Sequence, residues 1–261
     1  MEFKEVIGRR RSIRYFVPYR PVEREKIQTI LEAARLASCA VNATFLRAIV
    51  VQRDDLAPEV LEGLKTPVSA LNLELAPVHM YFYGDLRTLQ ESRGNTLKEL
   101  IEVGALNPSH GWSHAFVDEV VWKQVIEPLT RDPLKLVGAV AVDCGVAICQ
   151  ALLAAFDAGL GACLSAFEPQ RAQAAFGVPA HWMPLYAMLV GYPAESWEAG
   201  GQRPRPPFGE LYFEGRYGNP WRRDPHVVAR LTAAKMLQDP APLPWRQEEV
   251  KTLARAFGLP E

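Results

Sequence analysis

The segment from Asp143 to Ala158 constrains the fold of this 261-residue chain more than any other. Nearly every position in it is apolar, small side chains recur along it, and Gly159 follows as a natural helix stop. A helix that is apolar on all sides is normally buried, and small side chains let a second helix approach closely. Its longest uncharged apolar run, 144–156, is shorter than the ~20 residues that span a bilayer, so we expect a buried helix and no membrane segment.

Shorter patterns on either side of this segment predict an α+β domain whose sheet is covered on both faces. Pro169 and Gly177 bracket a further helix, since proline is tolerated in a first turn and glycine ends helices. Apolar runs rich in β-forming residues predict strands, and helical spacing predicts one helix near the N-terminus and another after Pro21. The expected helices cover 2–9, 22–36, 143–158, 169–177, 227–237 and 247–257, and the expected strands 48–52, 78–83, 162–165 and 186–190.

The chain changes character after Gly191, where glycine, proline and arginine become frequent. The last two helical patterns carry too little apolar surface to form a core of their own. We therefore expect one domain over residues 1–217, and a tail over 218–261 that packs on that domain or on a partner subunit.

Composition excludes several classes of protein. The chain holds 29 Lys and Arg against 30 Asp and Glu, a net charge of −1, which argues against binding nucleic acid or anionic lipid as a main task. Its four cysteines show no CxxC spacing, and residues 1–14 are charged and lack an apolar signal segment. These features predict reduced thiols and a cytoplasmic protein. Cys144 and Cys149, inside the apolar segment, are expected to be small core residues.

A basic run near the N-terminus is the first candidate site. Arg10, Ser12 and Arg14 alternate in a stretch expected to be extended, so their side chains project to one side. Two guanidinium groups flanking a hydroxyl suit a phosphate, because planar guanidinium groups donate two parallel hydrogen bonds to its oxygens. The alternative interpretation is a solvated arginine face at a helix C-terminus.

A second basic segment lies far along the chain. Residues 202–223 hold five arginines against two glutamates, and Arg203 and Arg205 are again two residues apart. Pro204 and Pro206 favour an extended backbone around them. Together the two basic segments would suit a dianionic monophosphate, although a flexible basic loop fits the pattern as well.

The glycines from Gly159 to Gly161 do not form a dinucleotide-binding fingerprint. They follow a helix and enter a strand, which reverses the Rossmann order, and a third glycine is missing. Glycine here serves close backbone approach, either of helix to strand or of backbone to a flat ligand. The sequence leaves both possibilities open.

An aromatic segment follows Asn107. His110 and His114 have the i, i+4 spacing of a metal-binding helix, but no glutamate follows the first and no third ligand is near, so we expect no metal. Trp112, Phe116 and Trp122 predict either a core-facing helix or a lid over a flat substrate.

Four motifs, taken in order, resemble the FMN-dependent nitroreductase superfamily. The opening R-x-S-x-R followed by aromatic residues is met at 10–16, and a small-residue loop with asparagine at 37–42. The apolar helix running into G-L-G-x-C is met at 143–163. The late G-Y-P and basic segment are met at 191–193 and 203–205.

The resemblance implies an α+β fold with a mixed sheet flanked by helices, and a homodimer with the long apolar helix at its interface. It implies FMN as cofactor, NAD(P)H as co-substrate, a small flat acceptor such as a nitroaromatic, quinone or enone, and hydride transfer through flavin N5. The backbone of Leu164, Ser165 and Ala166 would face the ring, and Ser165 and Ala166 would contact N5. The other cofactor-binding residues it implies are Arg10, Arg11, Ser12, Arg14, Cys39, Ala40, Asn42, Asn72, Arg203 and Arg205, with Cys39, Ala40 and Asn42 coming from the other subunit. The substrate-contacting residues would be His110, Trp112, His114, Phe116 and Trp122.

One departure from the family pattern concerns a loop. Where relatives usually read N-x-Q-P-W, this chain has Asn42-Ala43-Thr44-Phe45-Leu46. The change alters a turn and a packing aromatic beside the expected flavin. Two alternatives therefore stay open: a flavin-binding or storage protein that nicotinamides do not reduce, and a dehydrogenase or dehalogenase of the same family.

Overall fold

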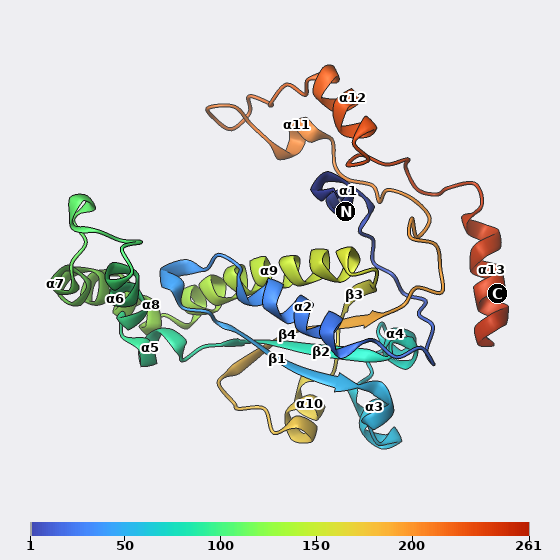
Figure 1. Cartoon of the computed structure of the whole chain (residues 1–261), viewed down its shortest axis with the longest axis horizontal. Coiled ribbons are helices and arrows are strands. Elements are labelled where there is room, and N and C mark those ends of the chain that lie inside the picture. The colour runs from blue at the N-terminus through green and yellow to red at the C-terminus, as the bar shows by residue number, and fades with distance from the viewer. Residues whose placement is uncertain (1, 261) are drawn as a thin grey trace.

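The computed structural model describes residues 2–260 and is built around a four-stranded antiparallel sheet (Figure 1). The strands are β1 (Leu46–Gln52), β2 (Val78–Asp85), β3 (Gly161–Ser165) and β4 (Trp182–Gly191), in the order β1-β2-β4-β3. The expectation of a mixed sheet is wrong for these strands. Each strand runs antiparallel to its neighbour, and on its other edge β3 meets the N-terminal run through an isolated parallel bridge between Ser12 and Ala162.

Helices cover both faces of the sheet, as expected. Helices α2 and α9 lie on one face, and α3 and α10 on the other (Figure 1). The short helices α5 to α8 gather at one end of the molecule. The bounds are α1 Phe3–Arg9, α2 Arg24–Arg35, α3 Pro58–Leu64, α4 Ala70–Leu75, α5 Thr88–Ser92, α6 Asn95–Glu102, α7 His114–Phe116, η4 Val117–Ile126, α8 Glu127–Arg131, α9 Pro133–Asp157, α10 Pro169–Phe176, α11 Phe208–Leu211, α12 Pro225–Ala233 and α13 Arg246–Phe257, with single turns η1 Ala40–Asn42, η2 Arg53–Asp55 and η3 Pro108–His110.

Strand β2 shows how alternation builds two cores. Met80 and Phe82 pack with α2 and α9, whereas Tyr81 and Tyr83 pack with the residues of α4 and α10 on the opposite face. All eight residues of β2 are buried, because the strand is central and covered on both sides.

Helix α9 starts ten residues earlier than the sequence predicts. Pro133 occupies its first turn, and the carboxylate of Asp132 accepts a hydrogen bond from Lys135 N at 3.2 Å, which caps the helix. By length and composition α9 could cross a membrane. One face of it, however, packs on the sheet through residues such as Cys144, Ala147 and Ala151, as the central helix of a folded domain does.

The other face of α9 remains uncovered in the single chain. We call it the α9 stripe, and its exposed members are Leu134, Val137, Gly138, Val142, Gly145, Val146 and Cys149. A stripe of apolar side chains this long is unusual on a monomer surface and is typical of an interface.

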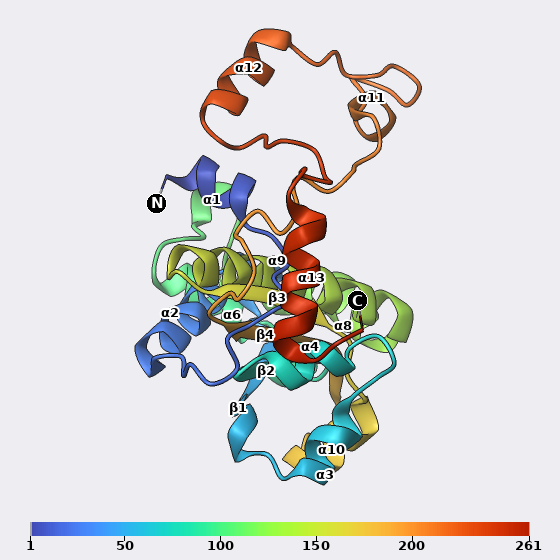
Figure 2. The same ribbon diagram turned by 90° about the vertical axis from the view of Figure 1, so that its right-hand side faces the viewer.

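The tail forms a projecting arm and a docked helix (Figure 2). Residues 203–234, with α11 and α12, extend away from the sheet. The two ends of this arm are joined where Gln202 N donates to Asp239 O at 2.7 Å and Ala241 N donates to Gln202 O at 2.9 Å. Helix α13 then returns to the domain, where Leu253 is buried and Phe257 stacks on Tyr15.

Candidate functional site

The first basic run has the predicted alternation. Arg11 and Ile13 are buried, whereas Arg10, Ser12 and Arg14 are not, so these three side chains share the outward face. Ile13 N donates to Ala162 O at 3.1 Å, which holds the run beside the edge strand β3. The run is therefore fixed in place by the sheet and is not a loose charged tail.

The fold brings the second basic segment to the first. The guanidinium of Arg11 donates to Gly201 O at 3.3 Å and to Gln202 Oε1 at 3.2 Å. Arg11 is only 8% exposed, so its side chain joins the two segments and does not lie on the outward face with Arg10 and Arg14. The resemblance placed Arg11 among the cofactor-binding residues, and these contacts with the chain itself do not support that role.

A buried ion pair reinforces this junction. The side chain of Glu195 is 1% exposed and lies 2.7 Å from Arg246 of α13. Its other oxygen accepts hydrogen bonds from the backbone N–H groups of Arg14, at 2.6 Å, and Tyr15, at 3.1 Å. Neither Glu195 nor Arg246 was singled out from the sequence, because nothing local distinguishes them from other charged residues.

Electrostatics show that the arginines of both segments lie close together. Burial lowers the pKa of Arg10, and the neighbouring charge of Arg205 lowers it further, while Cys149 acts in the opposite sense. Burial also lowers the pKa of Arg203, and the charge of Arg14 adds to that effect. Like charges are costly to gather without a counter-charge, so this group, which we call the arginine cluster (Arg10, Arg14, Arg203 and Arg205), suits an anionic ligand.

Next to the cluster lies an apolar groove of about 470 Å³ between α9 and the sheet, a volume within the usual range for ligand sites. Cys149 and Leu164 line it, and the first basic run is bridged to β3 beside Leu164 through Ser12 and Ala162, so the groove lies near the cluster. The prediction that Cys149 is a core residue is wrong, because its side chain is exposed at the groove. Cys144 is buried as predicted, and burial raises its pKa to about 12. The lining residues are Ala141, Gly145, Ile148, Cys149, Leu152, Leu164, Pro184, Leu185 and Tyr186.

The glycine-preceded strand contributes one wall of this groove. Leu164 is 37% exposed and lines it, and Ala166 is exposed as well, whereas Ser165 between them is buried. Leu164 thus lies beside an open groove. At Gly161 a Cβ would lie 2.9 Å from the side chain of Ile13, so this glycine serves the close approach of the first basic run to β3. Asn72 is on α4 and is partly exposed, and its side chain makes no hydrogen bond within residues 2–260.

The loop at Cys39–Asn42 lies apart from the arginine cluster in the single chain (Figure 1). Ala40 N donates to the carboxylate of Asp143 on α9 at 2.6 Å. Val41 and Asn42 both have positive φ, at 50° and 55°, a conformation that stores strain. Leu46 stands at the position of the family tryptophan and Phe45 at that of the proline; Phe45 is 2% exposed in a core cluster that Leu46 also contacts, so the departure from the family pattern is accommodated by packing.

The aromatic segment also lies far from the cluster, at the opposite end of the long axis (Figure 1). Its interior positions Val117 and Ile126 are buried, and the rings of Trp112 and Trp122 pack against that core. Phe116 remains 37% exposed and makes an edge contact with Trp112 at 5.5 Å. The segment is therefore partly core-facing.

The two histidines of that segment contact different residues. His110 bonds to Asn107 Oδ1 at 3.1 Å, and His114 lies 3.8 Å from Glu102. Within residues 2–260, no group of three His, Cys, Asp or Glu side chains is arranged to hold a metal ion.

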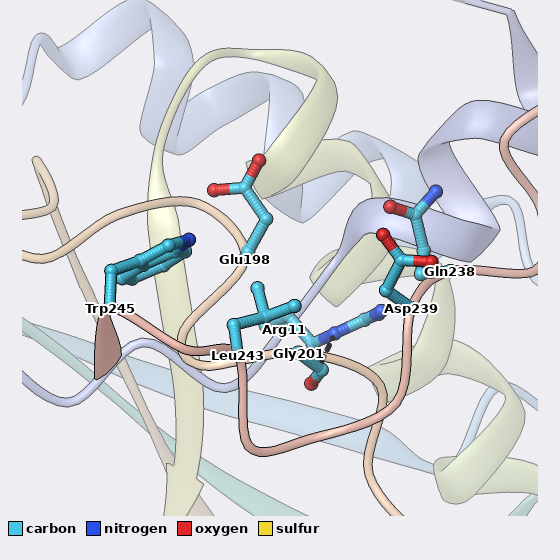
Figure 3. Close-up of a pocket in the computed structure, with 7 residues that line it drawn as sticks. All are labelled: Arg11, Glu198, Gly201, Gln238, Asp239, Leu243 and Trp245. Atoms are coloured by element: carbon cyan, nitrogen blue, oxygen red, sulfur yellow. Dashed lines mark hydrogen bonds between the residues drawn. The ribbon is translucent and has the colours of Figure 1, made fainter. Parts of the chain in front are cut away.

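A second, more polar cavity of about 370 Å³ lies at the base of the arm (Figure 3). Its lining combines the guanidinium of Arg11 with acidic and amide groups and the ring of Trp245. In Figure 3 Asp239 lies beside the guanidinium and the carboxylate of Glu198 points away from it, so the lining carries both signs of charge and the cavity is not a simple anion site. The lining residues are Arg11, Glu198, Gly201, Gln238, Asp239, Leu243 and Trp245.

Comparisons with known proteins agree on one family. The sequence model of the nitroreductase family matches residues 7–192. A nitroreductase family protein from Streptococcus pneumoniae TIGR4 is similar, with a TM-score of 0.63 and 19% identity over 82% of this chain and 100% of that one. A candidate nitroreductase from Exiguobacterium sibiricum 255-15, solved in complex with FMN, has a TM-score of 0.64 and 21% identity over 81% of this chain and 96% of that one. A candidate NAD(P)H:FMN oxidoreductase from Staphylococcus epidermidis ATCC 12228 has a TM-score of 0.64 and 19% identity over 81% of this chain and 94% of that one.

At these identities the solved structures show a shared fold and no more. No curated protein matches the sequence.

Proposed function

Because this chain belongs to the nitroreductase family of oxidoreductases, we propose that it binds FMN and transfers a hydride from NAD(P)H to a small, flat acceptor. The observation that carries the proposal is that residues 10–14, which hold two arginines of the cluster, are bridged to β3, and Leu164 of β3 lines the apolar groove. The arginine cluster gives the site a positively charged end, and the groove gives it an apolar body. This combination matches a ligand that carries a phosphate on one side and a tricyclic ring on the other. The FMN-bound structure of the Exiguobacterium relative supports the same cofactor.

The residues present fit this cofactor. In our proposal Arg10, Arg14, Arg203 and Arg205, with the hydroxyl of Ser12, hold the phosphate and ribityl chain through charge-assisted hydrogen bonds. Arg11 and the Glu195–Arg246 pair keep the two basic segments together and act as positioning residues. Such preorganisation lowers the cost of gathering like charges when the ligand arrives.

Bound FMN supplies hydride chemistry at N5, and the protein positions it and sets its electrostatic surroundings. The backbone of Ser165 and Ala166 would lie along the ring and donate to N5. The positive charge of Arg14 and Arg203 would stabilise negative charge on the reduced ring. Asn72, with an unpaired amide, would hold the pyrimidine edge.

A homodimer completes the site in this proposal. The α9 stripe would form the interface, and the partner would supply Cys39, Ala40 and Asn42, which lie too far from the cluster in one chain. Dimerisation would also bring the aromatic segment to the acceptor site of the partner subunit. The residues of that segment are His110, Trp112, His114, Phe116 and Trp122. A cytoplasmic location is part of the same proposal.

Removal of single arginines tests cofactor binding. We expect Arg10→Ala and Arg205→Ala each to weaken FMN affinity by about 10- to 100-fold, since a hydrogen bond to a charged group contributes roughly 1.5–3 kcal/mol. Arg216→Ala is the matched control, because Arg216 belongs to the same basic segment but lies out on the arm. Affinity is measured by titrating the apoprotein into FMN and following flavin fluorescence. Equal affinities for all four proteins would contradict the phosphate assignment.

Anaerobic reduction tests the enzyme. We expect the yellow protein to bleach on addition of NADPH or NADH and to recover its colour with a nitroaromatic, quinone or enone acceptor. A yellow protein that neither nicotinamide reduces would favour the flavin-binding or storage alternative. Turnover of a halogenated or peptide-like substrate would instead favour the dehalogenase or dehydrogenase alternative.

A further inference from the structure

Tyr186 occupies an unusual place in the sheet. It lies on the inner strand β4, one residue before Ala187, which pairs with Ser165 of β3. In an antiparallel pair the next residues along face each other, so Tyr186 lies across from Ala166. The five residues that follow Tyr186 on β4 are all buried, yet Tyr186 itself is 50% exposed.

The exposure of Tyr186 coincides with an irregularity in the sheet. Met188 and Val190, further along β4, are buried against α9. Before them the register between β2 and β4 shifts, because Tyr81 pairs with Ala187 but Tyr83 pairs with Pro184, and at this irregularity the phenol ring of Tyr186 forms a wall of the apolar groove beside α9. Leu164, diagonal to it on β3, forms the adjoining part of the same wall.

The chemistry of this wall indicates an aromatic ligand. Tyr186 and Leu164 offer a flat apolar surface, and the Tyr186 hydroxyl makes no hydrogen bond within the described residues. The groove also follows α9 from Cys149, beside Arg10, to Ala141. The rise along α9 from Ala141 to Cys149, eight steps of 1.5 Å, is about 12 Å, and Leu152 extends the lining further, so the groove has room for a ring whose phosphate is held near Cys149.

We propose that Tyr186 contacts the ring system of the bound flavin and contributes to its affinity. The inference rests on the proposed FMN function, and it adds a side-chain contact from β4 to the backbone contacts of β3. Tyr186 is a positioning residue in this proposal: it orients the ring along the groove, and its hydroxyl takes no part in hydride transfer.

Three substitutions at Tyr186 distinguish a direct contact with the flavin ring from a purely structural role. Tyr186→Leu removes the aromatic ring, Tyr186→Phe removes only the hydroxyl, and Tyr186→Trp keeps a large aromatic that donates electrons readily. Tyr19→Leu is the matched control, because Tyr19 is an 85% exposed tyrosine that does not line the groove. Each variant is titrated with FMN, and the fluorescence of the bound flavin is recorded, because a tyrosine or tryptophan in contact with the ring quenches it by electron donation.

We expect Tyr186→Leu to weaken FMN affinity by about threefold to tenfold, the usual effect of losing one aromatic contact. Bound-flavin fluorescence should rise in Tyr186→Leu and Tyr186→Phe and stay low in Tyr186→Trp and the control. A purely structural role would not produce this pattern, since fluorescence reports the donor at the ring. The Phe variant, which nearly conserves size, and the Trp variant, which keeps an aromatic ring, keep the test valid if the Leu variant folds poorly.

Unchanged affinity and unchanged fluorescence in all three variants would overturn the contact while leaving FMN binding intact. Failure of the unmodified protein to bind FMN would instead refute the proposed function on which the contact rests. The two failures are therefore distinguishable in a single series of titrations.

Discussion

His79 lies on β2 with no exposed surface, and its ring is fully hydrogen-bonded in the neutral form. Nε2 is 3.0 Å from Leu73 O and 3.1 Å from Ala76 O, so it donates to the carbonyls at the end of α4. Nδ1 lies 3.1 Å from the hydroxyl of Tyr81 and accepts from it. Protonation would add a charge and a second donor in a site that water does not reach. Burial accordingly lowers the pKa of His79 to about 4, although the two backbone hydrogen bonds partly oppose this.

The sign and size of the effect follow from linkage. Above pH 6.5 the histidine is neutral in both the folded and unfolded states and contributes no pH dependence. As the pH falls below 6.5 the unfolded chain takes up a proton that the folded chain refuses, so stability declines until the folded pKa is reached near pH 4. At about 1.4 kcal/mol per unit of pKa, the loss between pH 7.5 and 4.5 is about 2.5 kcal/mol.

Urea unfolding at pH 7.5, 6.5, 5.5 and 4.5 measures this loss in the unmodified protein and in His79→Gln. Glutamine can donate to the α4 carbonyls but cannot take up a proton, and every other group titrates in both proteins. We expect His79→Gln to be the less stable protein at pH 7.5, and the difference to shrink by about 2.5 kcal/mol by pH 4.5. Parallel stability curves, or an NMR titration that places the pKa of His79 near 6.5, would refute the reasoning.

Three further predictions concern the junction, the thiols and the interface. Arg246→Met should destabilise the fold by about 3 kcal/mol in urea unfolding, because it leaves a buried carboxylate without its cationic partner; a loss below about 1 kcal/mol would show that the backbone donors suffice. Maleimide labelling followed by peptide mass spectrometry should spare Cys144 and Cys163 in the folded protein and modify both after unfolding in urea, because both are buried and burial raises the pKa of each thiol to about 12; labelling of either in the folded protein would contradict its burial. Val142→Glu should convert a dimer to a folded monomer in light scattering, and a dimer that survives the substitution would exclude the α9 stripe as interface.

Local patterns predicted much of this fold because they depend on neighbours in sequence. Pro169 and Gly177 bracket α10 as expected, since each residue restricts the backbone at its own position. The expected strands are all present, although β4 begins at Trp182, before the apolar run at 186–190. The sequence patterns missed the first ten residues of α9, because its cap and first turn, Asp132 and Pro133, lie outside the apolar run.

Sequence patterns predicted only part of the candidate site. Alternation at residues 10–14 follows from backbone geometry, and it correctly set Arg11 apart from Arg10 and Arg14. The exposure of Cys149 could not be predicted, since an all-apolar helix does not show which face meets the sheet. Glu195 and Arg246 form their pair across fifty residues, and no spacing rule connects them.

The sequence by itself determined the local elements and the spacing of their side chains. These are an apolar helix that must be covered, two arginine pairs with regular spacing, and strands whose side chains alternate between faces or are wholly buried. These follow from covalent geometry and the hydrophobic effect, which act over a few residues. Only the tertiary structure decided which groups meet. The approach of residues 203–205 to residues 10–14, and the groove that opens beside them, depend on how α13 and β3 pack, because long-range contacts are fixed by the burial of the whole chain and not by any segment of it.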